Sequence, residues 1–311
     1  MLLSLRYNIN VSSYILNRAN IFLYNTYRYN SNSQNRWLQR NSNDIYTREA
    51  KLKNWRSRAA FKLVELDDKF NLFHKKSKIQ NILDLGFAPG SWSQVARSKT
   101  HPKSIIMGID ILPCKPIEGV HALQANILSK KTHDMIRLFF NEKFNLNEDD
   151  DLDQNLGYLD KSYMDTNNND NITTNLNDSD TKHYPIDLII SDMYVPYPKD
   201  FENSNITSNL TNMPYYRLMN TSGVAIRDHL QSVDLCDAAL VTAIDLLRPN
   251  GNFVCKLYTG KEEHLFKKRL QKVFRKVSKF KPDSSRSMSK EVYYVGIGKK
   301  NDIDKLDVFT T

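Results

Sequence analysis

The stretch ILDLGFAPGSWSQ at residues 82–94 constrains the fold of this chain more than any other. Its first four residues are mostly apolar and are typical of a strand in a parallel sheet with both faces covered. Gly86 and Gly90 then allow the backbone to turn tightly and to approach a ligand, and Ser91 can cap a helix. A strand, a turn and a helix N-terminus in this order present backbone amides to an anion. The stretch therefore predicts a pocket for a cofactor with an anionic group.

The spacing of the two glycines separates two kinds of cofactor. A dinucleotide pyrophosphate favours G-x-G-x-x-G, but the three residues between Gly86 and Gly90 include no glycine. S-adenosylmethionine, which presents a carboxylate, fits the turn without a central glycine. Asp110 ends an apolar run at 104–110, where an acidic side chain can accept hydrogen bonds from ribose hydroxyls. The pattern favours S-adenosylmethionine, although a lone glycine turn is also compatible with an ordinary strand-to-helix connection.

Strand and helix patterns alternate along most of the chain. Residues 47–68 are predicted to be helical with a break near Asn54, and further helices are expected at 130–144, 226–247 and 262–275. The last two strands are close enough in sequence to pair antiparallel at one edge. This order predicts a doubly wound α/β sheet, with helices on both faces and ligands at the carboxyl ends of the strands. Strands are expected at 81–85, 104–110, 121–124, 186–192, 252–257, 277–281 and 292–298.

The N-terminal region has a composition of its own. The first 43 residues contain five arginines and no Asp or Glu, and they mix serines with large apolar side chains. This composition is typical of a transit peptide. Polar residues interrupt the apolar stretch, so it fits neither a secretory signal nor a membrane span. Residues 1–35 are therefore predicted to be a mitochondrial transit peptide that directs the protein to the matrix. The alternative is a disordered basic tail that is not a targeting signal.

Two polar segments interrupt what is otherwise one domain. Residues 145–181 are rich in Asn and Asp and contain too few large apolar side chains to form a packed core, so they predict a disordered insertion. A shorter polar insertion is expected at 202–212. Because the predicted sheet needs strands from both sides of these insertions, residues 36–300 are expected to form a single domain, followed by a tail at 301–311.

The charge of the chain favours a polyanionic partner. The formal net charge is +9, and residues 148–180 contain ten acidic side chains against one lysine, so the rest of the chain sums to +18. Such a surplus favours nucleic acid, although a well-solvated surface would have the same composition. Near the predicted first helices, five basic residues flank Trp55 and Phe61, which could contact phosphates and stack on a base, or else lie in the core under a basic face. The basic residues are Lys51, Lys53, Arg56, Arg58 and Lys62.

Four charged residues stand beside the predicted strands and helices. Asp192 closes one strand, Lys256 ends another, Glu291 precedes the last strand, and Lys62 lies on the helix before the sheet. Each alone is compatible with a solvated surface position. If they converge, two ammonium groups and two carboxylates could bind a hydroxyl and let one lysine accept its proton. The three cysteines form no C-x-x-C pair, so neither a disulfide framework nor a metal site is predicted.

Several segments together resemble one family. The chain is similar to the FtsJ-type ribosomal RNA 2'-O-ribose methyltransferases over residues 36–300, apart from the insertions, and most of all to their mitochondrial branch. The resemblance implies a Rossmann-like S-adenosylmethionine-dependent methyltransferase fold, with a seven-stranded, mostly parallel sheet and an antiparallel edge strand. The segments that carry it are RSRAAFKL, DLGFAPGSWSQ, GIDILPCKPIEGV, SDM, FVCKLYTG and SMSKEVYYVG.

The resemblance also implies a reaction. The expected activity is methylation of a uridine ribose in mitochondrial large-subunit rRNA, in the A-loop of the peptidyl-transferase centre, in support of ribosome assembly. The expected partners are that rRNA or a pre-ribosomal particle, and the protein is expected to be a monomer. Two other classes stay open: an enzyme that methylates transfer RNA or another RNA, and an assembly factor without catalysis.

The family's site residues map onto this sequence. The Lys-Asp-Lys-Glu tetrad falls on Lys62, Asp192, Lys256 and Glu291, with Lys256 as the base. The cofactor would contact Pro89, Gly90, Ser91 and Trp92, Asp110 at the ribose, Asn126 and Ile127 at the adenine, and Asp192. Two departures stand out: Asn126 replaces a frequent Asp, and the segment MYVPYP follows Asp192 in place of the bacterial sequence. An amide can still accept from the adenine amino group, though without a charge.

Overall fold

The computed structural model describes residues 44–74, 77–153, 184–198 and 218–310. The predicted transit peptide at 1–35 and the insertion at 202–212 lie outside these residues, as does most of the insertion at 145–181. The chain divides into two compact units, residues 1–48 and 49–311. Of the first unit only residues 44–48 are described, and they include the start of α3 (Ile45–Leu52). The fold below is that of the second unit.

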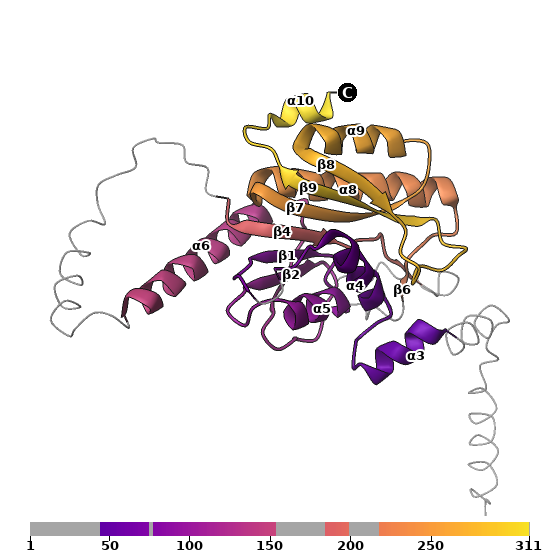
Figure 1. The fold of residues 1–311 in the computed structure, drawn as a ribbon. Coiled ribbons are helices and arrows are strands. Elements are labelled where there is room, and N and C mark those ends of the chain that lie inside the picture. Colours follow the sequence, from indigo (N-terminus) through magenta and orange to yellow (C-terminus); the bar gives the residue numbers. More distant parts are fainter. Residues whose placement is uncertain (1–43, 75–76, 154–183, 199–217, 311) are drawn as a thin grey trace, which may run out of the picture. The chain divides into compact units, whose positions relative to one another are not determined.

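A seven-stranded sheet forms the centre of this unit (Figure 1). The strand order is β3-β2-β1-β4-β7-β9-β8, and the first five strands run parallel. β9 runs antiparallel to both β7 and β8. The predicted doubly wound sheet with an antiparallel pair at one edge is therefore confirmed, with β8 outermost. The strands are β1 (Ile82–Leu85), β2 (Ile106–Asp110), β3 (His121–Gln124), β4 (Ile186–Ser191), β7 (Leu247–Tyr258), β8 (Phe274–Phe280) and β9 (Glu291–Lys299).

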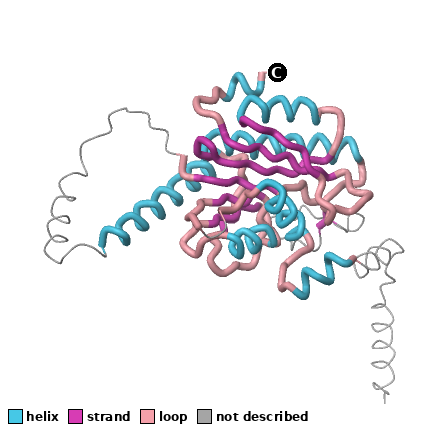
Figure 2. The backbone as a smooth tube through the Cα atoms, in the orientation of Figure 1, coloured by secondary structure: helices cyan, strands magenta, loops and turns pink. Residues whose placement is uncertain are grey.

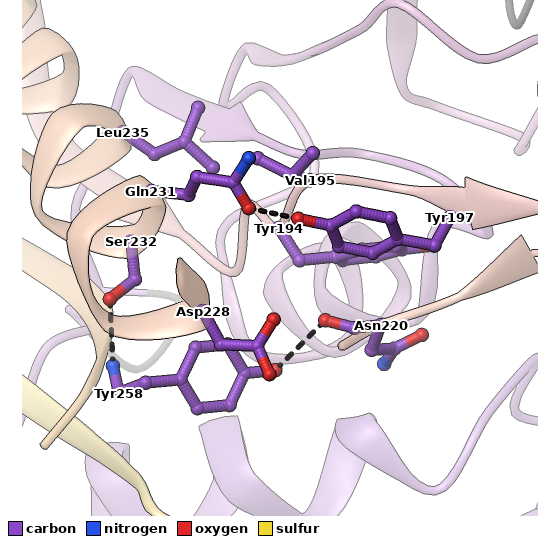
Figure 3. A pocket seen from close by; sticks show the side chains of 9 residues that line it. All are labelled: Tyr194, Val195, Tyr197, Asn220, Asp228, Gln231, Ser232, Leu235 and Tyr258. Atoms are coloured by element: carbon purple, nitrogen blue, oxygen red, sulfur yellow. Dashed lines mark hydrogen bonds between the residues drawn. The ribbon is translucent and has the colours of Figure 1, made fainter. Parts of the chain in front are cut away.

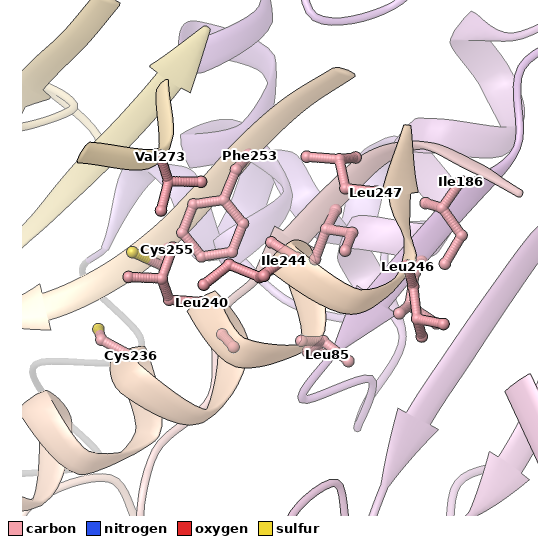
Figure 4. Close-up of a cluster of buried hydrophobic side chains, with 14 of the residues drawn as sticks. Leu85, Ile186, Cys236, Leu240, Ile244, Leu246, Leu247, Phe253, Cys255 and Val273 are labelled. Atoms are coloured by element: carbon pink, nitrogen blue, oxygen red, sulfur yellow. The ribbon is translucent and has the colours of Figure 1, made fainter. Parts of the chain in front are cut away.

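Helices cover both faces of the sheet, as the tube view shows (Figure 2). On one face, α4 (Ala59–Phe70) and α5 (Ser91–Lys99) pack against side chains such as Ile82, Val254 and Tyr293. The other face holds a larger apolar cluster, in which α8 (Ala225–Leu246) and α9 (Glu263–Val273) contact Leu85 and Phe253 (Figure 4). Because side chains alternate along a strand, neighbouring residues of β7 and β9 reach opposite clusters. This alternation decides which polar residues face α4.

The structure differs from the prediction in three elements. α6 (Lys130–Asp153) continues into the segment predicted as a disordered insertion at 145–181, so that expectation is wrong up to Asp153. The tail contains a short helix, α10 (Lys305–Phe309), whose Val308 is buried in the larger cluster. The loop after β4 contains β5 (Tyr197–Pro198), which pairs antiparallel with β6 (Leu218–Met219). Among the described residues, no helix is both long and apolar enough to span a membrane.

Candidate active site

The topology brings the carboxyl ends of β1, β4 and β7 to one edge of the sheet. β9 is antiparallel to β7, so its first residue also lies there, and Glu291 pairs with Tyr258. Lys256 and Val254 are two residues apart on β7, so their side chains lie on the same face of the sheet. Val254 belongs to the apolar cluster under α4 and α5. Lys62 projects from α4, which packs on that same face. Strand order and side-chain alternation thus explain why residues distant in sequence meet at this edge.

Two ion pairs bring the four predicted tetrad residues together. Lys62 Nζ lies 2.8 Å from Glu291 Oε2. Lys256 Nζ lies 3.1 Å from Asp192 Oδ1 and donates a hydrogen bond of 2.8 Å to the Asp192 main-chain oxygen. Tyr293 connects the pairs, because its hydroxyl donates to Asp192 Oδ1 at 3.0 Å and its ring centroid lies 5.9 Å from Lys62 Nζ. The sequence reasoning missed Tyr293, although its position two residues after Glu291 on one strand places it on the same face.

The tetrad is buried and charged. The Lys256 side chain is 2% exposed, and that of Asp192 is 18% exposed. Burial alone would raise the pKa of Glu291, but the ammonium groups of Lys62 and Lys256 outweigh it and hold that pKa below its usual value. Burial, together with the carboxylates of Asp192 and Glu291, raises the pKa of Tyr293 well above its ordinary value. Glu291 therefore stays ionised and Tyr293 stays a hydrogen-bond donor at neutral pH.

One N–H group of the Lys256 ammonium has no hydrogen-bond acceptor among the described residues. An ammonium has three N–H groups, and two of them are accounted for by the main-chain and side-chain oxygens of Asp192. Within the described part of the chain, the third has no hydrogen-bond acceptor. A substrate hydroxyl that approached this group would be oriented by it, and a deprotonated lysine at the same place would accept the hydroxyl proton. The geometry suits activation of an alcohol.

The glycine turn that follows β1 approaches the tetrad closely. Gly86 has φ +83° and Gly90 has φ +101°, both in the left-handed region that favours glycine. A Cβ at Gly86 would lie 2.8 Å from the main chain of Met193, the residue after Asp192. The turn therefore brings the predicted cofactor loop, residues 86–92, against the segment that contains Asp192, the predicted catalytic carboxylate.

Polar side chains of the cofactor loop and its surroundings are engaged within the protein. Asp110 accepts from the Ala88 and Leu112 amides at 2.8 Å each, and burial raises its pKa. Ser91 accepts from the Ser57 hydroxyl at 2.8 Å. Trp92 is 3% exposed, and its indole nitrogen donates to the Ala59 oxygen at 2.9 Å. These bonds shape the loop, so its backbone and the remaining lone pairs of Asp110 are what a cofactor could contact.

Asp84, in the middle of β1, is a further candidate that the sequence reasoning missed. Its side chain is buried; Oδ2 accepts from the Ser93 hydroxyl at 2.6 Å, while Oδ1 has no hydrogen-bond partner in the described structure. Burial, reinforced by Asp192 and Asp110, raises its pKa to about 7 despite the Ser93 bond. An unpaired buried carboxylate oxygen beside the cofactor loop fits a cation, such as the ammonium of S-adenosylmethionine. The signal in the sequence is an acid inside an apolar strand.

Asn126 and Ile127, the predicted adenine contacts, follow β3. The Ala125 amide donates to the Asp110 oxygen at 2.9 Å, so this turn lies beside the end of β2. Asn126 is exposed, and its side-chain oxygen accepts from the Leu128 amide at 3.0 Å. Ile127 is buried in the larger apolar cluster. Asn126 is thus accessible to a ligand, whereas Ile127 mainly anchors the turn.

The two aromatic residues of the basic segment before α4 differ in burial. Phe61 is buried, and Trp55 packs edge-to-face on it with ring centroids 4.9 Å apart. Lys53 Nζ lies 5.2 Å from the Trp55 centroid and 5.1 Å from that of Phe61. Arg56 donates to the Pro89 oxygen at 2.9 Å and so holds the cofactor loop. Phe61 therefore belongs to the core, as one of the two alternatives expects, whereas Trp55 is only partly buried, so stacking of a base on Trp55 stays a prediction.

A shallow pocket of about 10 Å³, which is room for about one water molecule, lies beside Lys256. Residues of α8 line one side, and residues of the segment after Asp192 line the opposite side (Figure 3). Lys256 Nζ lies 5.2 Å from the ring centroid of Tyr194 and 5.9 Å from that of Tyr258, both of which belong to the lining. The lining residues are Tyr194, Val195, Tyr197, Asn220, Asp228, Gln231, Ser232, Leu235 and Tyr258.

Comparisons with known proteins identify close relatives. A model of the FtsJ-like methyltransferase family matches residues 55–299. The mitochondrial rRNA methyltransferase 2 of Saccharomyces cerevisiae is 57% identical over 300 residues, which are 91% of this chain and 93% of that protein. The protein of the same name from Schizosaccharomyces pombe is 33% identical, covering 85% and 95%. Ribosomal RNA large subunit methyltransferase E of Granulibacter bethesdensis is 32% identical, covering 90% and 91%.

Proposed function

This chain belongs to the FtsJ-like methyltransferase family, and from that premise we propose that it methylates the 2'-hydroxyl of a uridine in mitochondrial large-subunit rRNA with S-adenosylmethionine. The relatives named mitochondrial rRNA methyltransferase 2 and ribosomal RNA large subunit methyltransferase E support rRNA as the substrate. The A-loop of the peptidyl-transferase centre is the proposed target. The protein would act in the matrix as a monomer, on the rRNA or on a pre-ribosomal particle.

The observation that carries this proposal is the buried ammonium of Lys256 with its uncommitted N–H. A ribose 2'-hydroxyl is a poor nucleophile at neutral pH, so it must be positioned and must lose its proton as it attacks. Lys256 orients the hydroxyl and, when deprotonated, accepts that proton, while Asp192 fixes the lysine through two contacts. The pair of Lys62 and Glu291 holds the neighbouring geometry. When bound, S-adenosylmethionine supplies an electrophilic methyl group.

The residues around the turn fit this cofactor. The backbone of residues 89–92 leads into the N-terminus of α5, where amides favour a carboxylate. The unpaired oxygen of Asp84 suits the cofactor ammonium, and Asp110 suits its ribose hydroxyls. Asn126, exposed beside the end of β2, suits the adenine, with Ile127 anchoring its turn. The proposed cofactor site and the tetrad thus adjoin each other across the contact between Gly86 and Met193.

The experiment that tests this function is a map of ribose methylation in mitochondrial large-subunit rRNA, with and without the protein. One uridine in the A-loop should lose its 2'-O-methyl group when the gene is deleted and regain it when the wild-type gene is restored. The variant Lys267→Ala, which changes an exposed lysine of α9, should restore the methyl group as well as the wild type does. A methylation map that is unchanged by the deletion would contradict the proposed substrate.

A further inference from the structure

We infer that His229 is a positioning residue for the proposed methyl transfer, because it holds the end of β7 on which Lys256 lies. This inference rests on the proposed role of Lys256 in activating the ribose hydroxyl. His229 belongs to α8 and is 4% exposed, and the proposed chemistry does not use it. A polar side chain that is buried needs hydrogen-bond partners, and the partners of this one are main-chain groups next to the tetrad.

The two strands beside β7 do not accompany it to the same point. β4 pairs with β7 as far as Ser191 and Cys255, whereas β9 continues to pair with it up to Tyr258. Lys256 and Tyr258 are two residues apart, so their main-chain groups point to the same side of the strand. Groups that would bond to a longer β4 need other partners, because buried N–H and C=O groups are costly to leave unpaired.

Side chains of α8 bond to the main chain of these two residues. The Tyr258 amide donates to the Ser232 hydroxyl at 3.1 Å (Figure 3), and the Cys236 thiol donates to the Lys256 main-chain oxygen at 3.0 Å. His229 Nδ1 lies 2.7 Å from the Tyr258 main-chain oxygen. His229, Ser232 and Cys236 follow each other at intervals of three and four residues, so they lie on one face of the helix. This face of α8 therefore replaces a strand beside the last residues of β7.

Both nitrogens of the His229 ring contact the chain around the end of β7. A carbonyl oxygen can only accept, so Nδ1 carries the hydrogen that it donates to Tyr258. The Glu262 amide donates to Nε2 at 3.0 Å, and a Glu262 carboxylate oxygen lies 3.1 Å from the same nitrogen. A neutral ring bonds to the amide and a charged ring would bond to the carboxylate, but the Nδ1–H bond to Tyr258 is present in both states. His229 thus connects the end of β7 to the residue before α9.

The loop after β7 also packs closely on this ring. A Cβ at Gly260 would come within 2.2 Å of His229 Cγ, so the loop backbone lies directly against the imidazole. Lys256 Nζ lies 5.9 Å from the Tyr258 ring centroid, so the main chain that His229 holds is close to the ammonium. A displacement of about 1 Å in an active site can slow a reaction by about 100-fold. Loss of His229 should therefore lower the rate of methyl transfer.

The test measures the rate of methyl transfer separately from binding. His229→Ala should slow single-turnover methylation of the target RNA by about 10- to 100-fold, while its affinities for S-adenosylmethionine and for the RNA stay within about threefold of the wild type. His229→Asn can place an amide N–H at the position of Nδ1 and should recover most of the lost rate. His229→Gln, whose amide reaches the position of Nε2, should recover less.

His264→Ala is the matched control, because His264 is an exposed histidine of α9 whose Nδ1 lies 2.8 Å from the Lys261 main-chain oxygen. This variant should match the wild type in rate and in both affinities. A folded His229→Ala with the wild-type rate would overturn the inference, and so would a lower rate that is fully explained by weaker binding.

Urea unfolding shows which variants are folded. If His229→Ala is not, the comparison of His229→Asn with His229→Gln decides, and equal rates for these two variants would overturn the inference. A wild type that does not methylate the RNA would instead contradict the proposed function, and the inference with it. The two failures are therefore distinguished by the wild-type protein alone.

Discussion

The tetrad and the cofactor loop lie side by side, yet they present different parts of the chain to a ligand. In the tetrad the side chains are the proposed reactive groups, and Lys256 keeps an N–H without an acceptor among the described residues. In the cofactor loop Ser91 and Trp92 are engaged by Ser57 and Ala59, so the backbone is what remains to bind. Substitutions in the tetrad should therefore change turnover, whereas substitutions in the loop should change conformation and cofactor affinity.

The largest expected effect on stability tests the loop through its backbone. Gly86→Ala forces a Cβ into a left-handed conformation and to within 2.8 Å of the Met193 main chain, so it should destabilise the protein by about 3 kcal/mol and weaken cofactor binding. Urea unfolding and calorimetric titration with S-adenosylmethionine measure the two effects.

Gly223→Ala provides the control for this substitution. Gly223 has φ +85°, but nothing lies within 4 Å of its added Cβ, so the conformational cost of about 1 kcal/mol should appear alone. If the two variants lost equal stability, the close approach of the turn to Met193 would not contribute to the free energy of unfolding. The proposal that the loop acts through its backbone would then lose support.

The next effect concerns the charge in the tetrad. Glu291→Gln removes the ionic partner of Lys62 and should cost about 2 kcal/mol of stability at neutral pH. Because folding lowers the pKa of Glu291, its contribution is full above the ordinary glutamate value of 4.5 and is lost as the pH falls through the lowered pKa. The variant should therefore lose less stability than the wild type on acidification below about pH 4.5.

Unfolding by urea over a series of pH values measures this prediction. The stability difference between wild type and Glu291→Gln should shrink as the pH falls, and cofactor affinity at neutral pH should stay close to that of the wild type. A difference that stayed constant down to the most acidic point would mean that the Glu291 carboxylate is not stabilised by its lysines. A large loss of cofactor affinity would mean that the tetrad, like the loop, contributes to cofactor binding.

The smallest effect concerns the edge of the cofactor site. Asn126→Asp should tighten binding of S-adenosylmethionine by about two- to fivefold, because a carboxylate accepts a stronger hydrogen bond from the adenine amino group than an amide does. The bond to the Leu128 amide would be kept by either side chain, so the turn should not change. Calorimetric titration measures the affinity. Unchanged or weaker binding would remove Asn126 from the adenine site.

Most of the fold could be predicted because its signals are local. The β1 strand ends at a glycine turn, and β3 was predicted with the bounds that the structure shows. α10 could not be predicted, since five residues form a stable helix only through packing, here of Val308. The continuation of α6 into the acidic segment was missed because that segment has too few apolar residues to signal a packed helix.

The site was predictable only where a residue type implied chemistry. The tetrad residues were found as charges beside apolar strands and through the family resemblance, and the structure brings all four together. Tyr293 was missed because an aromatic residue in an apolar strand is expected to be a core residue. The pocket beside Lys256 could not be predicted, since two of its lining residues, Tyr197 and Gln231, are joined only by a tertiary contact between β5 and α8.

We propose that Lys256 acts on the substrate hydroxyl and not on the cofactor. The most direct measurement is single-turnover methylation of the target RNA by Lys256→Ala, together with its affinity for S-adenosylmethionine. The rate should be at least about 100-fold below that of the wild type, as for the loss of a general base, and the cofactor affinity should stay within about threefold of the wild type. The surface variant Lys267→Ala should match the wild type in both. Near-normal turnover by Lys256→Ala would contradict a role of Lys256 in activating the hydroxyl.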